Sequence, residues 1–345
     1  MTEYKISVIP GDGIGPELTD ATLKVLEATQ KKFGLQLNMV YAEAGDMCKE
    51  KLGVALPEDS IQKIKDSQAC LKGPVGETAA DVIVRLRLMF DLYANLRPIK
   101  TYPAAAAVRP DIDMYFVREN TEDVYKGLEY DIDGNTTICL RVITRKACER
   151  IAKRAFEMAR LRNGKKKVTT IHKANVMRVT DGLFAGVCRE ISKQYPDISF
   201  NELYVDAASM RLIKAPQEFD VLCTCNMFGD ILSDEAAQLV GGLGMAPGAN
   251  VGDTFALFEP IHGSAPNRAG KHTANPLSMI LSAKMMLDWL GEKYNDPKCI
   301  KAAGAIEEAV VQTLKAKNTV PDLGGSKTTI GMAEAIADAI AQATG

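Results

Sequence analysis

The chain has 345 residues, of which 46% are hydrophobic and 25% charged, and its formal net charge is −2. This composition is typical of a globular protein and offers no basic surface of the kind that binds nucleic acid or an acidic membrane. No apolar run approaches the roughly 18 residues needed to cross a bilayer, and a strand pattern begins at once without a targeting signal, so a cytoplasmic protein is expected.

The predicted elements alternate between strands and helices from the N-terminus onwards. A short apolar strand at 4–10 leads into a glycine-rich turn at 11–15 and a helix at 17–33. A second strand ends near Lys72, and a helix is expected at 79–94. Strand, turn and helix in this order and at this length predict an α/β layer with parallel strands.

The rest of the chain continues the alternation without an internal repeat. Glycines and a proline at 241–248 predict a loop-rich hinge. Strands are expected at 114–117, 137–142, 167–171, 202–205 and 221–224. Helices are expected at 146–162, 181–195, 276–290, 302–315 and 329–343.

The eight cysteines are scattered along the chain, several of them in apolar contexts. The close pair Cys223 and Cys225 has neither the spacing of a zinc knuckle nor that of a thiol–disulfide motif. We therefore expect buried free thiols in a reducing compartment.

The glycine-rich turn is not a dinucleotide-binding fingerprint. Its spacing, G-x-G-x-G-P, differs from G-x-G-x-x-G, and no acidic residue stands at the expected place after the next strand. Glycine permits a tight turn here, and Pro16 suits the first turn of a helix. Both a structural and a ligand-binding role remain open for this turn.

Three arginines, Arg87, Arg97 and Arg118, lie within 32 residues of one another, each in an apolar setting. Arginine is seldom buried without a partner, and its planar fork matches a carboxylate in a bidentate manner. Separate surface ion pairs are the simpler alternative. The grouping of three favours a pocket for an anion.

An acidic pair, Asp230 and Asp234, is spaced so that a helix places both side chains on one face. Like charges repel there unless a cation lies between them, and a hard divalent ion prefers oxygen ligands. Asp206, after a predicted strand, is a possible third ligand. The alternative is a solvated helix face.

Two further residues are candidates for proton transfer. Lys173 directly follows a predicted strand, where it is either a surface residue or a base whose pKa neighbouring cations lower. Tyr125 lies two helical turns beyond Arg118 and is a candidate proton donor.

Together these motifs resemble the β-decarboxylating dehydrogenases, the family of 3-isopropylmalate, isocitrate and homoisocitrate dehydrogenases. The resemblance covers essentially the whole chain and is closest to the archaeal isopropylmalate enzymes. The segments that carry it are 11–17, 91–98, 117–125, 172–177, 226–235, 259–266 and 321–325.

The resemblance implies a two-lobed α/β fold that is not a Rossmann domain and whose large lobe is discontinuous in sequence. Residues 1–92 and 241–345 would form the large, cofactor-binding lobe. Residues 93–240 would form the small lobe with the dimer interface and the metal ligands. The protein would be a homodimer, or a tetramer of the same chain.

The resemblance also implies roles for the candidate residues. Arg87, Arg97 and Arg118 would bind the substrate carboxylates. Mg²⁺ or Mn²⁺ would be held by Asp230, Asp234 and Asp206 of the partner subunit, Lys173 of the partner subunit would help deprotonate the C2 hydroxyl, and Tyr125 would protonate C3.

A nicotinamide cofactor is implied as well. Family members that use NAD usually have an aspartate at the position of Asn267, and Arg268 offers a partner for the 2′-phosphate of NADP. NAD is the prediction, with NADP as the alternative. The positions that match the cofactor site are Ile14, His262, Gly263, Ser264, Ala265, Asn267, Arg268 and Asn275.

The substrate prediction depends on the helix face that carries Arg87. Ala80, Ile83 and Val84 share that face by their spacing, and Val176 of the partner subunit would complete an apolar wall. Such a wall suits the isopropyl group of (2R,3S)-3-isopropylmalate and leaves a third carboxylate unpaired.

Isocitrate and homoisocitrate are the alternative substrates, because homoisocitrate enzymes often use an arginine near the position of Arg85. A non-catalytic regulatory subunit is an alternative of another class. It would be expected to have lost catalytic positions, which this chain retains.

Overall fold

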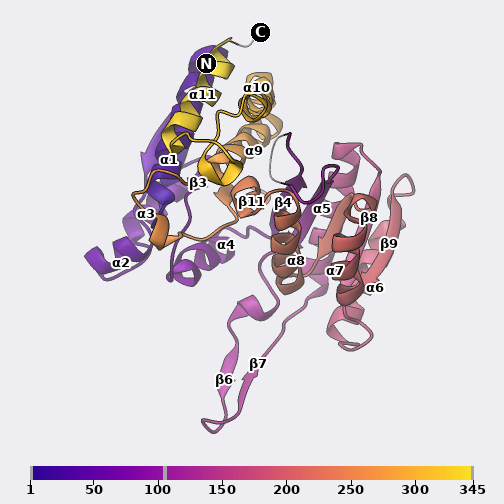
Figure 1. Ribbon diagram of the computed structural model, residues 1–345. Coiled ribbons are helices and arrows are strands. Elements are labelled where there is room, and N and C mark those ends of the chain that lie inside the picture. Colours follow the sequence, from indigo (N-terminus) through magenta and orange to yellow (C-terminus); the bar gives the residue numbers. More distant parts are fainter. Residues whose placement is uncertain (1–2, 104–106, 343–345) are drawn as a thin grey trace.

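One sheet runs through the whole molecule in the computed structural model, which describes residues 3–103 and 107–342 (Figure 1). In the described part of the chain it has ten strands in the order β2-β1-β3-β12-β11-β4-β5-β10-β8-β9. The strands are β1 (Glu3–Ile9), β2 (Gln36–Tyr41), β3 (Ala69–Lys72), β4 (Ala94–Lys100), β5 (Asp113–Glu119), β8 (Lys167–His172), β9 (Ser199–Tyr204), β10 (Val221–Thr224), β11 (Pro247–Val251) and β12 (Ala256–Pro260).

The sheet is mixed rather than purely parallel. β1, β2 and β3 run parallel, as do β5, β10, β8 and β9, which confirms the predicted α/β layer. At the centre, β11 pairs antiparallel with β12 and with β4, and β4 pairs antiparallel with β5. The antiparallel centre is the point at which the two halves of the sheet join.

Helices pack on both faces of the sheet (Figure 1). α1, α9, α10 and α11 gather at one end of the sheet, and α5 to α8 at the other. The helices are α1 (Gly15–Phe33), α2 (Asp46–Leu52), α3 (Glu58–Lys65), α4 (Arg85–Met89), α5 (Arg145–Arg162), α6 (Thr180–Ser192), α7 (Val205–Lys214), α8 (Asn226–Leu239), α9 (Leu277–Tyr294), α10 (Pro297–Lys315) and α11 (Thr329–Gln342).

Local sequence explains where the long helices begin and end. In α1, Pro16 occupies the first turn, and Gly34, with φ of 63°, ends the helix in the left-handed conformation that glycine adopts readily. α5 begins at Thr144, whose hydroxyl accepts a hydrogen bond from the Ala147 amide, and ends at Asn163 with φ of 47°. No helix of the described residues is long and apolar enough to span a membrane.

The strand order separates the chain as the predicted lobes would. β2, β1, β3, β12 and β11 come from residues 1–92 and 241–345, whereas β4, β5, β10, β8 and β9 come from residues 93–240. Hydrogen bonding continues across the junction between β11 and β4. The division into two lobes therefore stays a prediction.

A β-hairpin projects from the body of the molecule (Figure 1). Its strands are β6 (Glu129–Asp131) and β7 (Thr137–Cys139), and the side chains of both are exposed. β7 ends earlier than the predicted strand at 137–142. Cys139 is exposed with it, so the expectation of buried thiols is wrong at this one position and confirmed at the other seven.

The predicted helix at 79–94 is confirmed as far as Met89 and is wrong beyond it. The chain forms a π-helical turn at Ala80–Val84, the short helix α4, and a reversal at Asp91, whose φ of 46° is incompatible with a continuing helix. The Leu92 amide donates to the Arg87 carbonyl, which closes the helix end. The apolar spacing did not predict this helix end, because aspartate, unlike glycine or proline, is not a typical helix-terminating residue.

Five of the described strands, β2, β4, β6, β11 and β12, were not predicted from the sequence. β2 has exposed side chains on much of its length and therefore lacks a clear apolar pattern. Pro247 and Gly248, expected in a hinge loop, instead begin β11, which is buried throughout. Proline is tolerated at the first residue of a strand, and Gly248 lies close to Ile261 and the carbonyl of Glu259 on the neighbouring strand.

Candidate active site

The candidate site is built on the central pair of strands. β4 and β5 place Asn95 opposite Arg118, and Arg97 opposite Phe116, so these four side chains lie on the same face of the sheet. Helix α8 packs against that face and brings Asp230 and Asp234 to it. Its close approach depends on Gly229, because a Cβ there would lie 2.1 Å from Thr224 Oγ1 and 2.6 Å from Arg118 Cγ.

Two of the three predicted arginines and two of the three predicted aspartates meet in one cluster. Arg97 Nη2 lies 2.9 Å from Asp230 Oδ1, and Arg97 Nη1 lies 3.0 Å from Asp234 Oδ1. Arg118 Nη1 lies 2.5 Å from the same Asp230 oxygen. We call Arg97, Arg118, Asp230 and Asp234 the arginine cluster.

Charges and solvent are unevenly distributed within the arginine cluster. The arginine side chains are only 6% and 1% exposed, whereas Asp230 is 33% and Asp234 48% exposed. Burial, together with the neighbouring Arg97, lowers the pKa of Arg118 to about 10. Burial opposes ionisation of Asp230, but Arg118 and Arg97 outweigh it and lower its pKa to about 2. The pKa of Asp234 is raised, chiefly by burial.

Tyr125 reaches the arginine cluster from the segment that follows β5. Its hydroxyl donates a hydrogen bond to Asp230 Oδ2, and its ring lies 5.1 Å from the Arg118 guanidinium carbon. Burial raises the pKa of this phenol. The hydroxyl is therefore protonated at neutral pH and positioned next to the anion-binding groups, as a proton donor must be.

Arg87 reaches this region from α4, through contacts of its own. Its Nε donates to Asn250 Oδ1 at 3.0 Å, and its Nη2 lies 3.4 Å from Glu259 Oε1. Glu259 also pairs with the buried Lys72 at 2.7 Å. Burial opposes ionisation of Glu259, but Lys72 and Arg87 lower its pKa to about 2. Lys72 and Glu259 were not predicted, although a lysine inside the apolar run of β3 is a visible sign of a buried ion pair.

Lys173 and Asp206 pair with each other rather than with the arginine cluster. Lys173 Nζ lies 2.8 Å from Asp206 Oδ1, and this contact lowers the pKa of Asp206. Asp206 is 68% exposed. Among the described residues, no group of three acidic, cysteine or histidine side chains is arranged to hold a metal ion. Asp206 thus does not join Asp230 and Asp234 within one chain.

The predicted substrate wall is only partly formed within the chain. Ile83 is buried at 8% exposure, Val84 is half-buried, and Ala80 is exposed, because the π-helical turn does not keep the spacing of an α-helix. Arg85 is exposed. Val176 is 67% exposed on the segment that follows Lys173.

The predicted cofactor positions between 262 and 268 form a loop against the glycine-rich turn, which contains Ile14. The Ile14 amide donates to the Ser264 carbonyl at 2.9 Å, and a Cβ on Gly13 would lie 2.0 Å from that same oxygen. Burial lowers the pKa of His262, so its imidazole is neutral at pH 7. Gly263, Asn267 and Arg268 are exposed, Ala265 is half-buried, and Asn275 is buried.

The glycine-rich turn also has a structural role. A Cβ on Gly11 would lie 2.1 Å from the Pro74 carbonyl oxygen, in a conformation with φ of 79°. The Asp12 carboxylate accepts hydrogen bonds from the amides of Asp46, Met47 and Gly76. The turn thus caps α2 and packs against the cofactor loop at the same time.

A second ionic cluster lies beside the site and was not predicted from the sequence. Arg141 pairs with Asp123 and Asp181, whose side chains are 0% and 1% exposed. Asp181 accepts the Lys173 amide at 2.5 Å, and Asp123 accepts the Met227 amide at 3.1 Å. We call Arg141, Asp123 and Asp181 the Arg141 cluster. It ties the base of the hairpin to the segments that carry Lys173 and Asp230.

Comparisons with known proteins agree with this geometry. The model of a family described as isocitrate/isopropylmalate dehydrogenase matches residues 5–340. The chain is 53% identical to the 3-isopropylmalate/3-methylmalate dehydrogenase of Methanocaldococcus jannaschii, over 97% of this chain and 98% of that protein. It is 47% identical to the homoisocitrate dehydrogenase of the same organism, over 93% of each. The crystal structure of isocitrate dehydrogenase from Methylococcus capsulatus superposes with a TM-score of 0.92 at 44% identity, covering 98% of this chain and 100% of that one.

Proposed function

The chain belongs to the isocitrate/isopropylmalate dehydrogenase family, and from this premise we propose that it catalyses the oxidative decarboxylation of (2R,3S)-3-isopropylmalate. The observation that carries the proposal is the meeting of the buried Arg97 and Arg118 with the half-exposed Asp230 beside the Tyr125 hydroxyl. This arrangement places three functions side by side: arginines that can bind a substrate carboxylate, a carboxylate that can bind a metal ion, and a phenol that can donate a proton.

The arginines bind and orient the substrate. Arg97 and Arg118 are held from the protein side by Asn95 Oδ1 at 2.7 Å and by Asn226 Oδ1 at 2.6 Å. These contacts fix the planes of the guanidinium groups before the substrate arrives, so little side-chain entropy is lost on binding. The substrate carboxylates take over the guanidinium faces that now meet Asp230 and Asp234.

Asp230 and Asp234 are suited to a divalent cation. Both carboxylates are partly exposed, and they stand one helical turn apart on α8. Hard oxygen donors of this kind suit Mg²⁺ or Mn²⁺, and Asp206 of the partner subunit would add a third. A bound cation supplies Lewis-acid polarisation of the C2 oxygen and of the carbonyl it becomes.

Proton transfer is assigned to Lys173 and Tyr125. Lys173 of the partner subunit takes part in removing the C2 hydroxyl proton, and Tyr125 donates its phenolic proton to C3 after loss of CO₂. Because the pKa of Tyr125 is raised, the phenol stays protonated at neutral pH and can donate this proton. Because Lys173 and Asp206 come from another subunit, we propose an active homodimer, alone or within a tetramer.

The cofactor is proposed to be NAD, with NADP as the alternative, and it supplies the hydride acceptor. It would lie against the loop that runs from His262 to Arg268, beside Ile14 and Asn275. The exposed side chains of Asn267 and Arg268 would face the ribose. Initial rates with NAD⁺ and NADP⁺ decide between them, and the Arg268→Gln variant should weaken use of NADP⁺ without affecting NAD⁺.

The substrate proposal rests on the buried Ile83 and on similarity to relatives that are isopropylmalate dehydrogenases. It is tested by kcat/KM for isopropylmalate, isocitrate and homoisocitrate. We expect isopropylmalate to be preferred, and the Ile83→Ser variant to lose roughly 10- to 200-fold of that preference, the range for apolar pocket contacts. The matched control, Leu88→Ser on the exposed face of α4, should not alter the preference.

Homoisocitrate is the second candidate, because Arg85 is exposed two residues before Arg87 and a 47% identical relative is a homoisocitrate dehydrogenase. If homoisocitrate were the substrate, Arg85→Gln would reduce its kcat/KM selectively. A preference of the unchanged protein for a tricarboxylate would overturn the isopropylmalate proposal. Failure of all three acids to react with NAD⁺ or NADP⁺ and Mn²⁺ would favour a non-catalytic subunit.

A further inference from the structure

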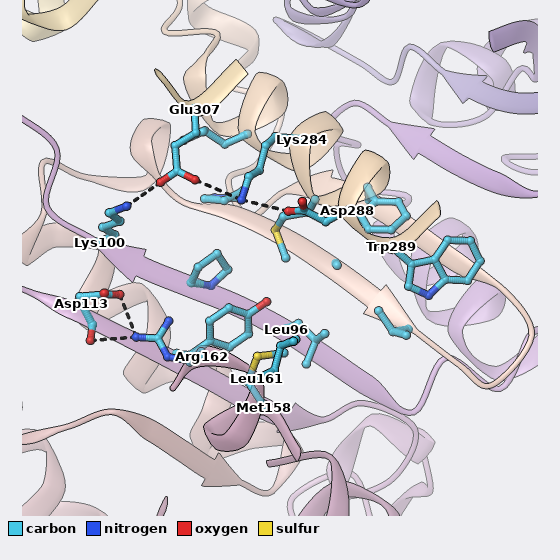
Figure 2. A pocket seen from close by; sticks show the side chains of 18 of the residues that line it. Leu96, Lys100, Asp113, Met158, Leu161, Arg162, Lys284, Asp288, Trp289 and Glu307 are labelled. Atoms are coloured by element: carbon cyan, nitrogen blue, oxygen red, sulfur yellow. Dashed lines mark hydrogen bonds and ion pairs between the residues drawn. The ribbon is translucent and has the colours of Figure 1, made fainter. Parts of the chain in front are cut away.

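A cavity of about 380 Å³ lies on the face of the sheet opposite the arginine cluster (Figure 2). Side chains alternate along β4, so Leu96, Pro98 and Lys100 point away from the face that carries Arg97. Strands β12, β11, β4 and β5 form the floor, α9 forms one wall, and α5 forms the other. The volume falls within the range of small-molecule sites in proteins, about 300–1,000 Å³.

The centre of this cavity is apolar. Met158 comes from α5, Val251 from β11, Phe258 from β12, and Trp289 from α9. Figure 2 shows Met158 and Leu161 at one end of the cavity and Trp289 at the other. A branched aliphatic or aromatic group placed here would contact both walls and lose its contact with water. The burial of apolar surface is the main source of affinity in a pocket of this kind.

Most of the charged groups at the rim are already paired. Lys284 lies 2.9 Å from Asp288 and 3.1 Å from Glu307, and Glu307 also contacts Lys100. On the other wall, Arg162 lies 2.8 Å from Asp113. Figure 2 shows these pairs bordering the cavity rather than crossing it. Of these groups only Asp288, whose side chain is 33% exposed, enters the ligand argument.

Arg154, on α5, differs from these groups. It forms no ion pair with any described residue, and its Nε is buried without a hydrogen-bond partner. Its charge acts on the hydroxyl of Tyr115, which receives no hydrogen bond from the described part of the chain, and on the carboxyl of Glu292. The terminal nitrogens of Arg154 also form no hydrogen bond or ion pair with a described residue, so a bound carboxylate would pair with them while Nε stays enclosed.

Two carboxyl groups of the α9 wall face the same cavity. Burial raises the pKa of both Asp288 and Glu292, which means that their negative charges are incompletely compensated. A small cation next to them would relieve this penalty. The cavity thus offers a cationic group on α5, acidic groups on α9, and an apolar space between them.

We propose that this cavity binds an apolar α-amino acid, with its carboxylate on Arg154, its ammonium group toward Glu292 and Asp288, and its side chain between Met158 and Trp289. A dianionic substrate does not fit this distribution of charge, because acidic groups line one wall. The inference is independent of the proposed function, since it concerns a site on the other face of the sheet.

Trp289 is the one tryptophan in the sequence, so its fluorescence reports binding at this site directly. L-leucine is the first probe, titrated into the full protein with calorimetry as a second readout. We compare it with L-leucinamide, which lacks the carboxylate, with 4-methylpentanoate, which lacks the ammonium group, and with glycine, which lacks the side chain. Each analogue should bind roughly 10-fold more weakly or worse, the loss expected for one charge-assisted hydrogen bond or one buried side chain.

The Arg154→Gln variant should lose leucine binding by a similar factor. Its matched control is Arg160→Gln, on the same helix, where the guanidinium pairs with Asp197 outside the cavity. The Arg118→Gln variant should keep leucine binding, which separates this site from the arginine cluster. Circular dichroism and the Tm of each variant verify folding.

Two results would overturn the proposal. One is the absence of both a fluorescence change and a heat signal with leucine and with phenylalanine at millimolar concentration. The other is leucine binding that is unchanged in Arg154→Gln but lost in Arg118→Gln, which would place the ligand in the arginine cluster. Neither result would bear on the dehydrogenase activity, which is measured separately.

Discussion

The segment from Arg118 to Tyr125 contributes to two ionic clusters that differ in their access to solvent. In the arginine cluster the cations are buried and the carboxylates of Asp230 and Asp234 are a third to a half exposed. In the Arg141 cluster both carboxylates are buried and Arg141 is only 11% exposed. Exposed oxygens can exchange one partner for another, whereas fully enclosed ones cannot without unfolding.

We interpret the arginine cluster as a ligand site and the Arg141 cluster as a structural ion-pair network, because only the first has solvent-accessible carboxylates. Asp230 and Asp234 now contact Arg97 and Arg118; with ligands bound, the arginines would pair with the substrate and the aspartates with the cation. Asp123 and Asp181 instead hold backbone amides of Met227 and Lys173 and have no route to a ligand. The two clusters should therefore respond in opposite ways to substitution, pH and metal.

The largest expected effect is on stability, in the Arg141 cluster. Arg141→Met would leave two buried carboxylates without a cation, and the free energy of unfolding should fall by about 3–5 kcal/mol. Urea denaturation measures this. The control Arg145→Met removes a half-exposed arginine paired with Glu190, for which a loss of roughly 1 kcal/mol or less is expected. Equal losses in the two variants would contradict the distinction between the clusters.

The second expected effect is on catalysis, in the arginine cluster. Arg118→Gln should lower kcat/KM for the substrate. The loss should correspond to about 2–5 kcal/mol of transition-state stabilisation, the cost of truncating one partner of a buried charge pair. Steady-state kinetics measure it, and circular dichroism verifies the fold. Arg97 still neutralises Asp230 in this variant, so the loss of stability should be smaller than in Arg141→Met. The reverse order of stability losses would refute the assignment.

The third expected effect is on the pH dependence of stability, to which Asp230 should contribute. Its pKa is about 2 in the folded protein, against 3.8 as the ordinary value, so the unfolded state binds the proton more readily. The stabilisation is complete above about pH 5 and is lost as the pH falls through 4 toward 2. It amounts to at most about 2 kcal/mol, since solvent reaches a third of the side chain. Asp230→Asn should lack this component when unfolding is compared at pH 6 and pH 3.

The smallest expected effect is stabilisation by metal. Mn²⁺ at tenfold its Kd should raise the free energy of unfolding by about 1.4 kcal/mol, because it binds the folded state alone. Differential scanning fluorimetry of the free protein measures the shift in Tm, and Asp234→Asn should abolish it. Arg145→Met should retain it. A shift that survives in Asp234→Asn would place the cation elsewhere.

Much of the fold follows from local patterns. The apolar runs at 167–171 and 221–224 predicted β8 and β10, and the helix predicted at 146–162 corresponds to α5. The helix predicted at 79–94 ends early, at Met89, because Asp91 turns the chain through a conformation set by its surroundings. β11 was missed because Pro247 and Gly248 are turn residues locally, and only burial between β12 and β4 makes them a strand.

The candidate site also has features that local sequence predicts and features that depend on tertiary structure. Spacing alone placed Asp230 and Asp234 on one helix face, and residue type alone marked Arg87, Arg97 and Arg118 as carboxylate ligands, because both depend on neighbours in sequence. Tertiary structure decided that the aspartates meet Arg97 and Arg118 but not Arg87, that Lys72 pairs with Glu259 across 187 positions, and that Arg141 joins Asp123 to Asp181. Such contacts depend on which strands lie side by side, and β4 lies between β5, the next strand in the chain, and β11, which is about 150 residues away in sequence.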